Sequence, residues 1–159
     1  MTPSLPCAPQ IGSRQAVETL RVLIGGEYSG TIRDAFIARG HYAMSCDFSP
    51  TAVPGPHYQG DWADIEGDGW DLAIYHRTCT FMANSGAKHI YADMNKDNGL
   101  NEDRWLEMGR HAWAFWKHRK TCPVRYAAWE NPVMLGYAQL MIGKSDQVVQ
   151  PWWFATDPD

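Results

Sequence analysis

The sequence lacks the usual marks of export, membrane insertion and metal binding. Its four cysteines (Cys7, Cys46, Cys79 and Cys122) form no CxxC pair and its six histidines show no HxxxH spacing, so we expect no metal site. No run approaches the roughly 18 apolar residues that a membrane helix requires. Residues 1–10 lack the pattern of a signal peptide. These absences predict reduced thiols and a cytoplasmic protein with no membrane partner.

Charge is also scarce, because only 20% of the 159 residues are charged and the net charge is −4. An acidic balance argues against a protein that binds nucleic acid by bulk charge, although a local basic face is compatible with it. The chain length and an apolar fraction of 45% predict one globular domain. Residues 1–16 are rich in proline and polar residues. We therefore expect a loosely ordered leader over 1–16 and a single domain over 17–159.

Short apolar runs alternate with helical patterns along the chain. The sequence predicts strands at 20–26, 41–47, 70–76 and 125–130, a short strand within 48–60 and a last strand at 146–152. It predicts helices at 31–40, 101–120 and 135–142. The second helix has an expected buried stripe of Trp105, Met108, Ala112, Phe115 and Trp116. This alternation is typical of an α/β fold with a parallel sheet covered on both faces.

Ligands of open parallel sheets bind beyond the carboxyl ends of the strands. Four segments end predicted strands here, namely 25–30, 46–47, 76–79 and 130–132. The glycine turn at 25–30 suits close approach of a ligand to the backbone, and Asp47 lies where an acid commonly binds a ribose hydroxyl. Because the full GxGxxG pattern is absent, a tight turn and a surface aspartate are the alternative.

Cys79 and Glu130 are the candidate reactive residues. Cys79 follows a predicted buried strand beside His76 and Arg77, and positive neighbours favour the thiolate. The alternative is an inert buried cysteine. Glu130 ends a strand, where partial desolvation would favour a protonated carboxyl that can donate a proton. The alternative is an exposed glutamate at a strand end.

Six segments, in their order, resemble the cofactor domain of the DNA cytosine-5 methyltransferases, and more narrowly the short methyltransferase-like proteins of bacteriophages. They span about Leu20 to Phe154 and read VLIGGEYSGTIRDAF, SCDFSP, YQGDW, WDLAIYHRTC, AAWENPVM and QVVQPWWF. The resemblance implies a Rossmann-like sheet that binds S-adenosylmethionine and is truncated at its C-terminal end. It implies that the residues holding the cofactor are Glu27, Tyr28, Ser29 and Gly30 at the methionine end, Asp47 at the ribose and Asp61 at the adenine.

The same resemblance makes Cys79 the nucleophile that adds to cytosine and Glu130 the acid that holds the base. The expected function is methyl transfer to cytosine in DNA or to a pyrimidine nucleotide. The chain departs from the family at Arg77-Thr78, where the family has two prolines, and it has no target-recognition domain. The alternative is a catalytically degenerate phage protein that binds DNA or a host defence protein. An aromatic C-terminal segment, Trp152 to Phe154, would then meet a partner or a second copy in a homodimer.

A basic stretch from Arg104 to Arg125 holds six Lys and Arg residues and one acid, Glu107. The candidate phosphate contacts are Arg77, Arg110, Lys117, Arg119 and Lys120. The alternative is a solvated helix face. The five carboxylates from Asp61 to Asp71 are expected to be solvated loop residues, with Asp61 as the exception.

Overall fold

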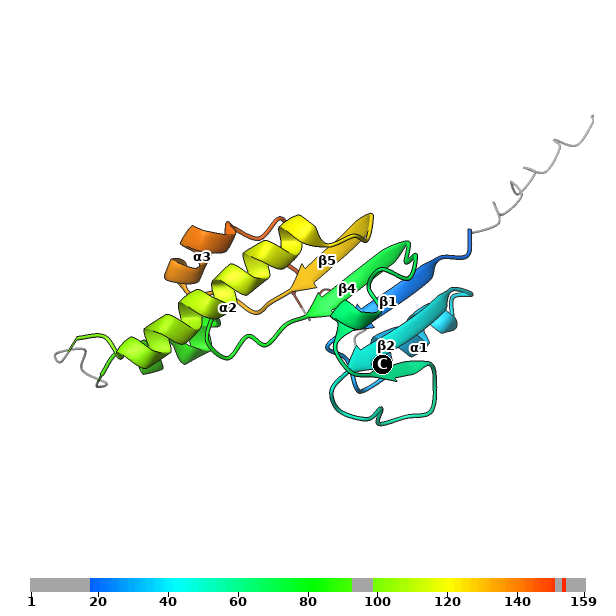
Figure 1. Ribbon diagram of the computed structural model, residues 1–159, viewed down its shortest axis with the longest axis horizontal. Helices are drawn as coiled ribbons and strands as arrows, with labels where there is room; N and C mark the ends of the chain where they lie inside the picture. The colour runs from blue at the N-terminus through cyan, green and yellow to red at the C-terminus, as the bar shows by residue number, and fades with distance from the viewer. Residues whose placement is uncertain (1–17, 93–98, 151–152, 154–159) are drawn as a thin grey trace, which may run out of the picture.

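The computed structural model describes residues 18–92, 99–150 and 153; the predicted leader, Trp152 and Phe154 lie outside these residues. A five-stranded sheet forms the centre of the molecule, with all neighbouring strands parallel and the order β3-β2-β1-β4-β5 (Figure 1). The strands are β1 (Arg21–Gly25), β2 (Tyr42–Asp47), β3 (His57–Gln59), β4 (Leu72–His76) and β5 (Tyr126–Glu130). These strands confirm the predicted ones, except that the described residues 146–150 of the predicted last strand form none.

The helices alternate with the strands and complete an α/β fold. They are α1 (Thr31–Ile37), α2 (Glu102–Thr121) and α3 (Gly136–Ile142), with the 3-10 helices η1 (Trp62–Asp64) and η2 (Asn84–Ile90). The chain builds the sheet outward from β1 to β3 and then returns to place β4 on the other side of β1. This order is compatible with a Rossmann-like fold, and it puts the switch point, where ligands of such sheets bind, between β1 and β4.

Two different layers cover the sheet. Helix α1 packs Ile32 and Phe36 on Val22 and Ile24, whereas η1 and the end of α2 lie on the opposite face, over a core that includes Tyr75. The prediction that both faces are covered is wrong at β5, because Tyr126 is 58% exposed and Ala128 is also exposed. The reason is that α3, which follows β5, packs against α2 and does not cross to the α1 face.

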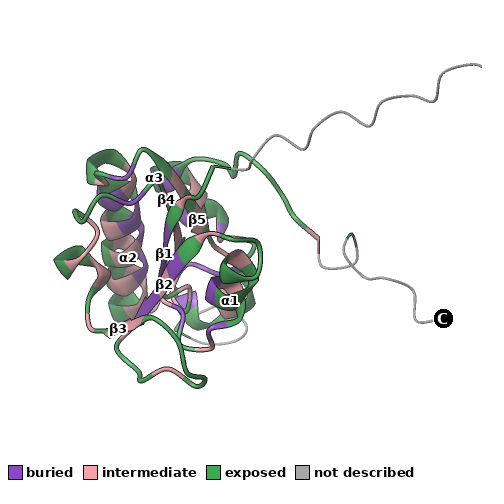
Figure 2. Cartoon of the chain, turned by 90° about the vertical axis from the view of Figure 1, so that its right-hand side faces the viewer, coloured by how far each residue is buried: buried purple, intermediate pink, exposed green. Residues whose placement is uncertain are grey.

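Helix α2 is buried along one side, where it contributes to one of the hydrophobic core clusters (Figure 2). Its start is capped by Asn101, whose side-chain oxygen accepts a hydrogen bond from the N–H of Arg104 at 3.1 Å. Met108, Ala112 and Phe115 are buried as predicted, but Trp116 is 43% exposed and the prediction for it is wrong. Among the described residues, no helix has the length and apolarity needed to cross a membrane.

Candidate functional site

The turn after β1 lies between the ends of β2 and β4. The N–H groups of Gly26 and Glu27 both donate to the carbonyl oxygen of Cys46, at 2.7 and 3.1 Å. Gly26 has a φ of +79°, and a Cβ added there would overlap the carbonyl oxygen of His76. Glycine is therefore required where the backbone of β1 passes that of β4, at the switch point of the sheet.

Glu27 anchors this turn to helix α1. Its side chain accepts hydrogen bonds from the N–H of Ile32 at 2.6 Å, the N–H of Arg33 at 3.2 Å and the hydroxyl of Ser29 at 3.2 Å. Only 6% of the residue is exposed, whereas Tyr28 beside it is 54% exposed. Both oxygens of Glu27 thus cap the start of α1, while Tyr28 beside it stays open to solvent.

Asp47 and Asp61 follow Glu27 along the same edge of the sheet. Asp47 ends β2, and its Oδ1 accepts a hydrogen bond from the N–H of Ser49 at 2.8 Å. Asp61 follows β3, and its Oδ1 accepts one from the N–H of Ala63 at 3.0 Å. Each loop therefore uses one oxygen of its carboxylate. Since β1, β2 and β3 are neighbours and parallel, the structure brings the three predicted acidic residues to one edge.

Arg33 fixes the loop beyond β2, a role that no pattern in the sequence predicted. The side chain is fully buried and donates to Ser45, Thr51 and the carbonyl oxygen of Pro54, each at 3.2 Å. Its Nε lies 2.8 Å from the carboxylate of Asp34. A buried arginine needs such partners, and here they hold the 48–56 loop against the carboxyl end of the sheet.

The segments that follow β4 and β5 are joined by backbone hydrogen bonds. Ala83 and Met134 form an antiparallel bridge. Beside that bridge, the N–H of Asn84 donates to Val133 and that of Leu135 donates to Met82, both at 2.7 Å. These segments begin at the two candidate reactive residues, because Cys79 lies three residues after β4 and Glu130 ends β5.

Glu130 lies directly opposite His76 in the register of β4 and β5. The Nδ1 atom of His76 is 3.3 Å from Oε2 of Glu130, so the two groups can share a proton. The Glu130 side chain is 55% exposed, and the expectation of a desolvated carboxyl is therefore wrong for the protein as described. Cys79 is half-buried, and its carbonyl oxygen accepts hydrogen bonds from the N–H groups of Met82 and Ala83.

Three buried polar atoms at this place have no hydrogen-bond partner among the described residues. They are Nε2 of His76 and both polar side-chain atoms of Asn131. A buried polar atom left without a partner costs about 1–3 kcal/mol, and proteins seldom leave several together. The ends of β4 and β5 therefore hold hydrogen-bonding capacity that the described residues do not use. A separate hollow of about 430 Å³ lies between η2 and α3. Its lining includes Asn84, Lys88, Tyr91, Leu135 and Tyr137.

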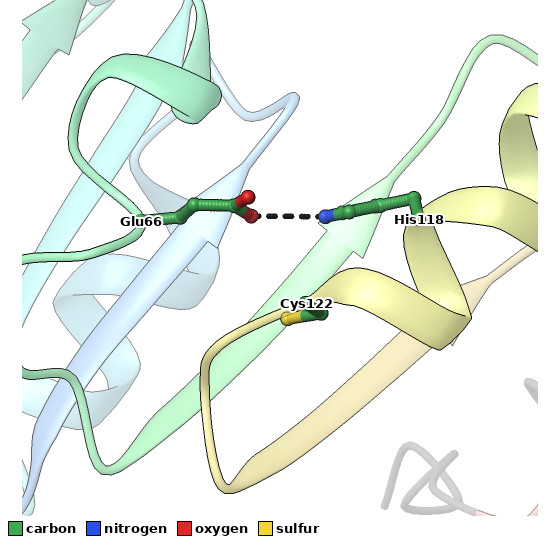
Figure 3. A group of neighbouring side chains, drawn as sticks. All are labelled: Glu66, His118 and Cys122. Atoms are coloured by element: carbon green, nitrogen blue, oxygen red, sulfur yellow. Dashed lines mark hydrogen bonds and ion pairs between the residues drawn. The ribbon is translucent and has the colours of Figure 1, made fainter.

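Glu66, His118 and Tyr75 form a hydrogen-bonded cluster on the α2 face of the sheet, and Figure 3 shows the pair of Glu66 and His118. The Nε2 atom of His118 lies 2.9 Å from Oε2 of Glu66, which also accepts from the hydroxyl of Tyr75 at 3.0 Å. The other ring nitrogen of His118 faces the indole N–H of Trp129 at 3.1 Å and the guanidinium of Arg77 at 3.2 Å. Both of these groups can only donate. His118 is therefore the neutral tautomer with its proton on Nε2, pointing at Glu66.

The same tautomer argues against a metal ion at this cluster. Glu66, His118 and Cys122 bring their ligand atoms within 4.8 Å of one another, which is close enough to consider one. A metal on Nε2 of His118 would require the proton on Nδ1, where a histidine ligand normally donates to an acceptor. Two donors, from Arg77 and Trp129, occupy that side instead. The donor set thus fits a hydrogen-bond network and does not fit a metal.

The cluster also draws Arg77 inward. The guanidinium lies over the ring of Trp62, 5.4 Å from its centroid, while it contacts His118. Burial lowers the pKa of Arg77, and the carboxylates of Asp61 and Glu66 oppose that effect. Burial also raises the pKa of the Tyr75 hydroxyl, which remains a donor to Glu66. Glu66 is therefore not a solvated loop carboxylate as the sequence predicted.

The predicted phosphate contacts on α2 separate into two groups. Arg110 is exposed but pairs with Glu107 at 2.6 Å, and Lys117 and Lys120 are exposed. Arg119 turns toward α3, where it donates to the carbonyl oxygen of Ile142 at 3.2 Å. Arg119 therefore links two helices, and the open cations of α2 are on its outer side.

Comparisons with models of protein families, with curated proteins and with solved structures gave no match for this chain. Its function therefore has to be inferred from the geometry of the carboxyl edge of the sheet.

Proposed function

We propose that this chain is a methyltransferase-like protein that binds S-adenosylmethionine at the carboxyl edge of its sheet and acts on cytosine in DNA or on a pyrimidine nucleotide. The observation that carries the proposal is the pairing of the segments after β4 and β5. That pairing ties the loop of Cys79 to the loop of Glu130 and Asn131. The buried, unpartnered atoms of His76 and Asn131 lie at the same ends and suit the donor and acceptor edge of a base.

The residue types at this place suit addition chemistry on a pyrimidine. A thiolate of Cys79 would add to carbon 6 of the ring, which makes carbon 5 nucleophilic enough to take a methyl group. S-Adenosylmethionine would supply that methyl group from its sulfonium sulfur. A protonated Glu130 would hold ring nitrogen 3, and His76, 3.3 Å away, would share its proton. Transfer of the carbon 5 proton to a water molecule would then expel the thiolate from carbon 6 and restore the double bond of the ring.

The acidic residues along the edge support a place for the cofactor. Asp47 and Asp61 follow neighbouring strands, and each uses one carboxylate oxygen in its own loop. An acid at the end of the second strand of such a sheet commonly binds ribose hydroxyls. The turn at Gly26 lies between the ends of β2 and β4, at the switch point where ligands of such sheets bind.

A second candidate function is a catalytically degenerate protein of the same fold that binds DNA or a host protein. Two observations favour it. Both oxygens of Glu27 already cap α1, so they are committed to the protein itself. Arg77 stands where the resemblance expects a proline, and its guanidinium covers Trp62 next to Asp61, the residue expected at the adenine.

Calorimetry and methyl transfer together separate these two functions. The first function predicts that S-adenosylmethionine binds and that a labelled methyl group reaches a cytosine-containing single strand. Transfer should be abolished in Cys79→Ser and retained in Cys7→Ser, while both variants still bind the cofactor. Binding without transfer by the unchanged protein would favour the degenerate protein. Absence of both binding and transfer would refute the first function.

A further inference from the structure

Two tryptophans stand open to solvent on the outer side of α2. Trp113 is 54% exposed and Trp116 is 43% exposed, although burying such a ring is normally favourable. They are three residues apart on a helix, so their side chains are neighbours on one face. Met108, Ala112 and Phe115 form the buried side of the same helix, and Figure 2 shows that α2 is buried along one side and exposed along the other. The structure thus presents two adjacent indole rings that the core does not use.

Cations accompany these rings along the same face. The ammonium group of Lys117 lies 5.1 Å from the centroid of the Trp113 ring, and Lys120 is exposed one turn beyond Trp116. Leu106 and Arg110 are exposed on the same face toward the start of the helix. Residues of this face thus recur every three or four positions from Leu106 to Lys120, over a length of roughly 21 Å. We call Leu106, Arg110, Trp113, Trp116, Lys117 and Lys120 the outer stripe of α2.

The charge around the outer stripe is opposite to that of the whole chain. Between Met108 and Trp129 there is no acidic residue, yet this stretch holds five of the 14 Lys and Arg residues. The chain as a whole has a net charge of −4. Among the stripe cations, only Arg110 has an ion pair among the described residues, to Glu107. A local positive surface on an acidic protein is the pattern expected of a site for a polyanion.

We propose that the outer stripe of α2 binds single-stranded nucleic acid, with Trp113 and Trp116 stacking on unpaired bases and Lys117 and Lys120 contacting phosphates. Every base has a flat face, and tryptophan is among the best platforms for it. In a duplex the bases stack on one another, so exposed rings add nothing there. The proposal deepens the proposed function, on which it rests only for the choice of substrate: a base that reacts with Cys79 has to be unpaired.

Anisotropy of a short fluorescein-labelled DNA strand, alone or annealed to its complement, tests the stripe. We expect the single strand to bind more tightly than the duplex. Trp113→Ala and Trp116→Ala should each weaken single-strand binding by about 5- to 150-fold. Lys117→Gln and Lys120→Gln should each reduce the slope of log affinity against log salt by about 0.7.

Tyr126→Ala is the matched control. Tyr126 is 58% exposed and has Arg125 over its ring at 5.0 Å, but it lies on the uncovered face of β5. The Tyr126→Ala variant should bind the single strand with the same affinity as the unchanged protein. Equal affinity for duplex and single strand, or equal affinity in the tryptophan variants, would overturn the proposal. So would a dimer that Trp113→Ala dissociates, because the stripe would then contact a second copy. Binding of S-adenosylmethionine is measured separately. If the cofactor binds and the single strand does not, the proposal for the outer stripe fails while the proposed function is not refuted.

Discussion

Replacing His118 by leucine tests the tautomer that the structure assigns to it. The change removes the Nε2–H group that lies 2.9 Å from Oε2 of Glu66 (Figure 3). The Glu66 side chain is 18% exposed and keeps the hydrogen bond from the hydroxyl of Tyr75. A buried acceptor that loses its donor costs about 1–3 kcal/mol when it is neutral, and about 3 kcal/mol or more when it is charged, as Glu66 is. Because Glu66 keeps some exposure and one hydrogen bond, we expect the lower end, about 3 kcal/mol. For a chain of this size that lowers Tm by roughly 6–12 °C.

The double variant His118→Leu with Glu66→Leu provides the control, because it removes both partners together. It should recover part of the stability that the single variant loses, since no carboxylate is left buried. Nitrogen chemical shifts of the His118 ring report the tautomer directly. A proton on Nδ1, or a rise in Tm when Zn²⁺ is added, would refute the assignment and restore the metal interpretation of this cluster.

Three further predictions concern other parts of the structure. Burial raises the pKa of the Cys46 thiol from 9.0 to about 12, and the carboxylates of Asp61, Asp47 and Asp64 add to this effect. Cys46 should therefore resist alkylation in the native protein up to pH 9, while Cys79 reacts. Labelling of Cys46 at the rate of Cys79 would contradict its burial. Because the folded pKa is the higher one, the stability due to Cys46 should fall as pH rises from 9 toward 12. Gly26→Ala should destabilise by about 3 kcal/mol or more in denaturant unfolding, whereas Gly40→Ala, at a similar φ with open space around it, should cost only about 1–2 kcal/mol. Arg33→Met should lower the free energy of unfolding by about 3 kcal/mol and expose the 48–56 loop to protease; an unchanged cleavage pattern would show that Arg33 does not hold that loop.

Four of the described strands, β1, β2, β4 and β5, could be predicted with their ends because each is a short, mainly apolar run with a clear end. Gly25 and Gly26 close the first run, and Asn131 with Pro132 closes the last one. Parallel pairing then follows from the alternation with helices, and it places Glu27, Asp47 and Asp61 at one edge. The candidate site was therefore accessible from the sequence as a set of strand ends.

What the sequence could not predict depends on long-range contacts. Periodicity assigned Trp116 to the core of α2, but the core is filled by Met108, Ala112 and Phe115, and Trp116 lies at its margin. A short polar run gave no sign that Glu66 meets His118, 52 residues later. The predicted partial desolvation of Glu130 was wrong for a similar reason, since no described helix covers that face of β5.

Trapping of Cys79 by a strand that contains 5-fluorocytosine tests the central claim most directly. The adduct normally breaks down when the proton on carbon 5 is removed. Fluorine at that position cannot be removed in this way, so a thiol adduct that has received a methyl group persists. Mass spectrometry after incubation with S-adenosylmethionine should find the adduct on the peptide that contains Cys79. The adduct should be lost in Cys79→Ser and reduced in Glu130→Gln. No adduct, or an adduct on another cysteine, would contradict the account of the site.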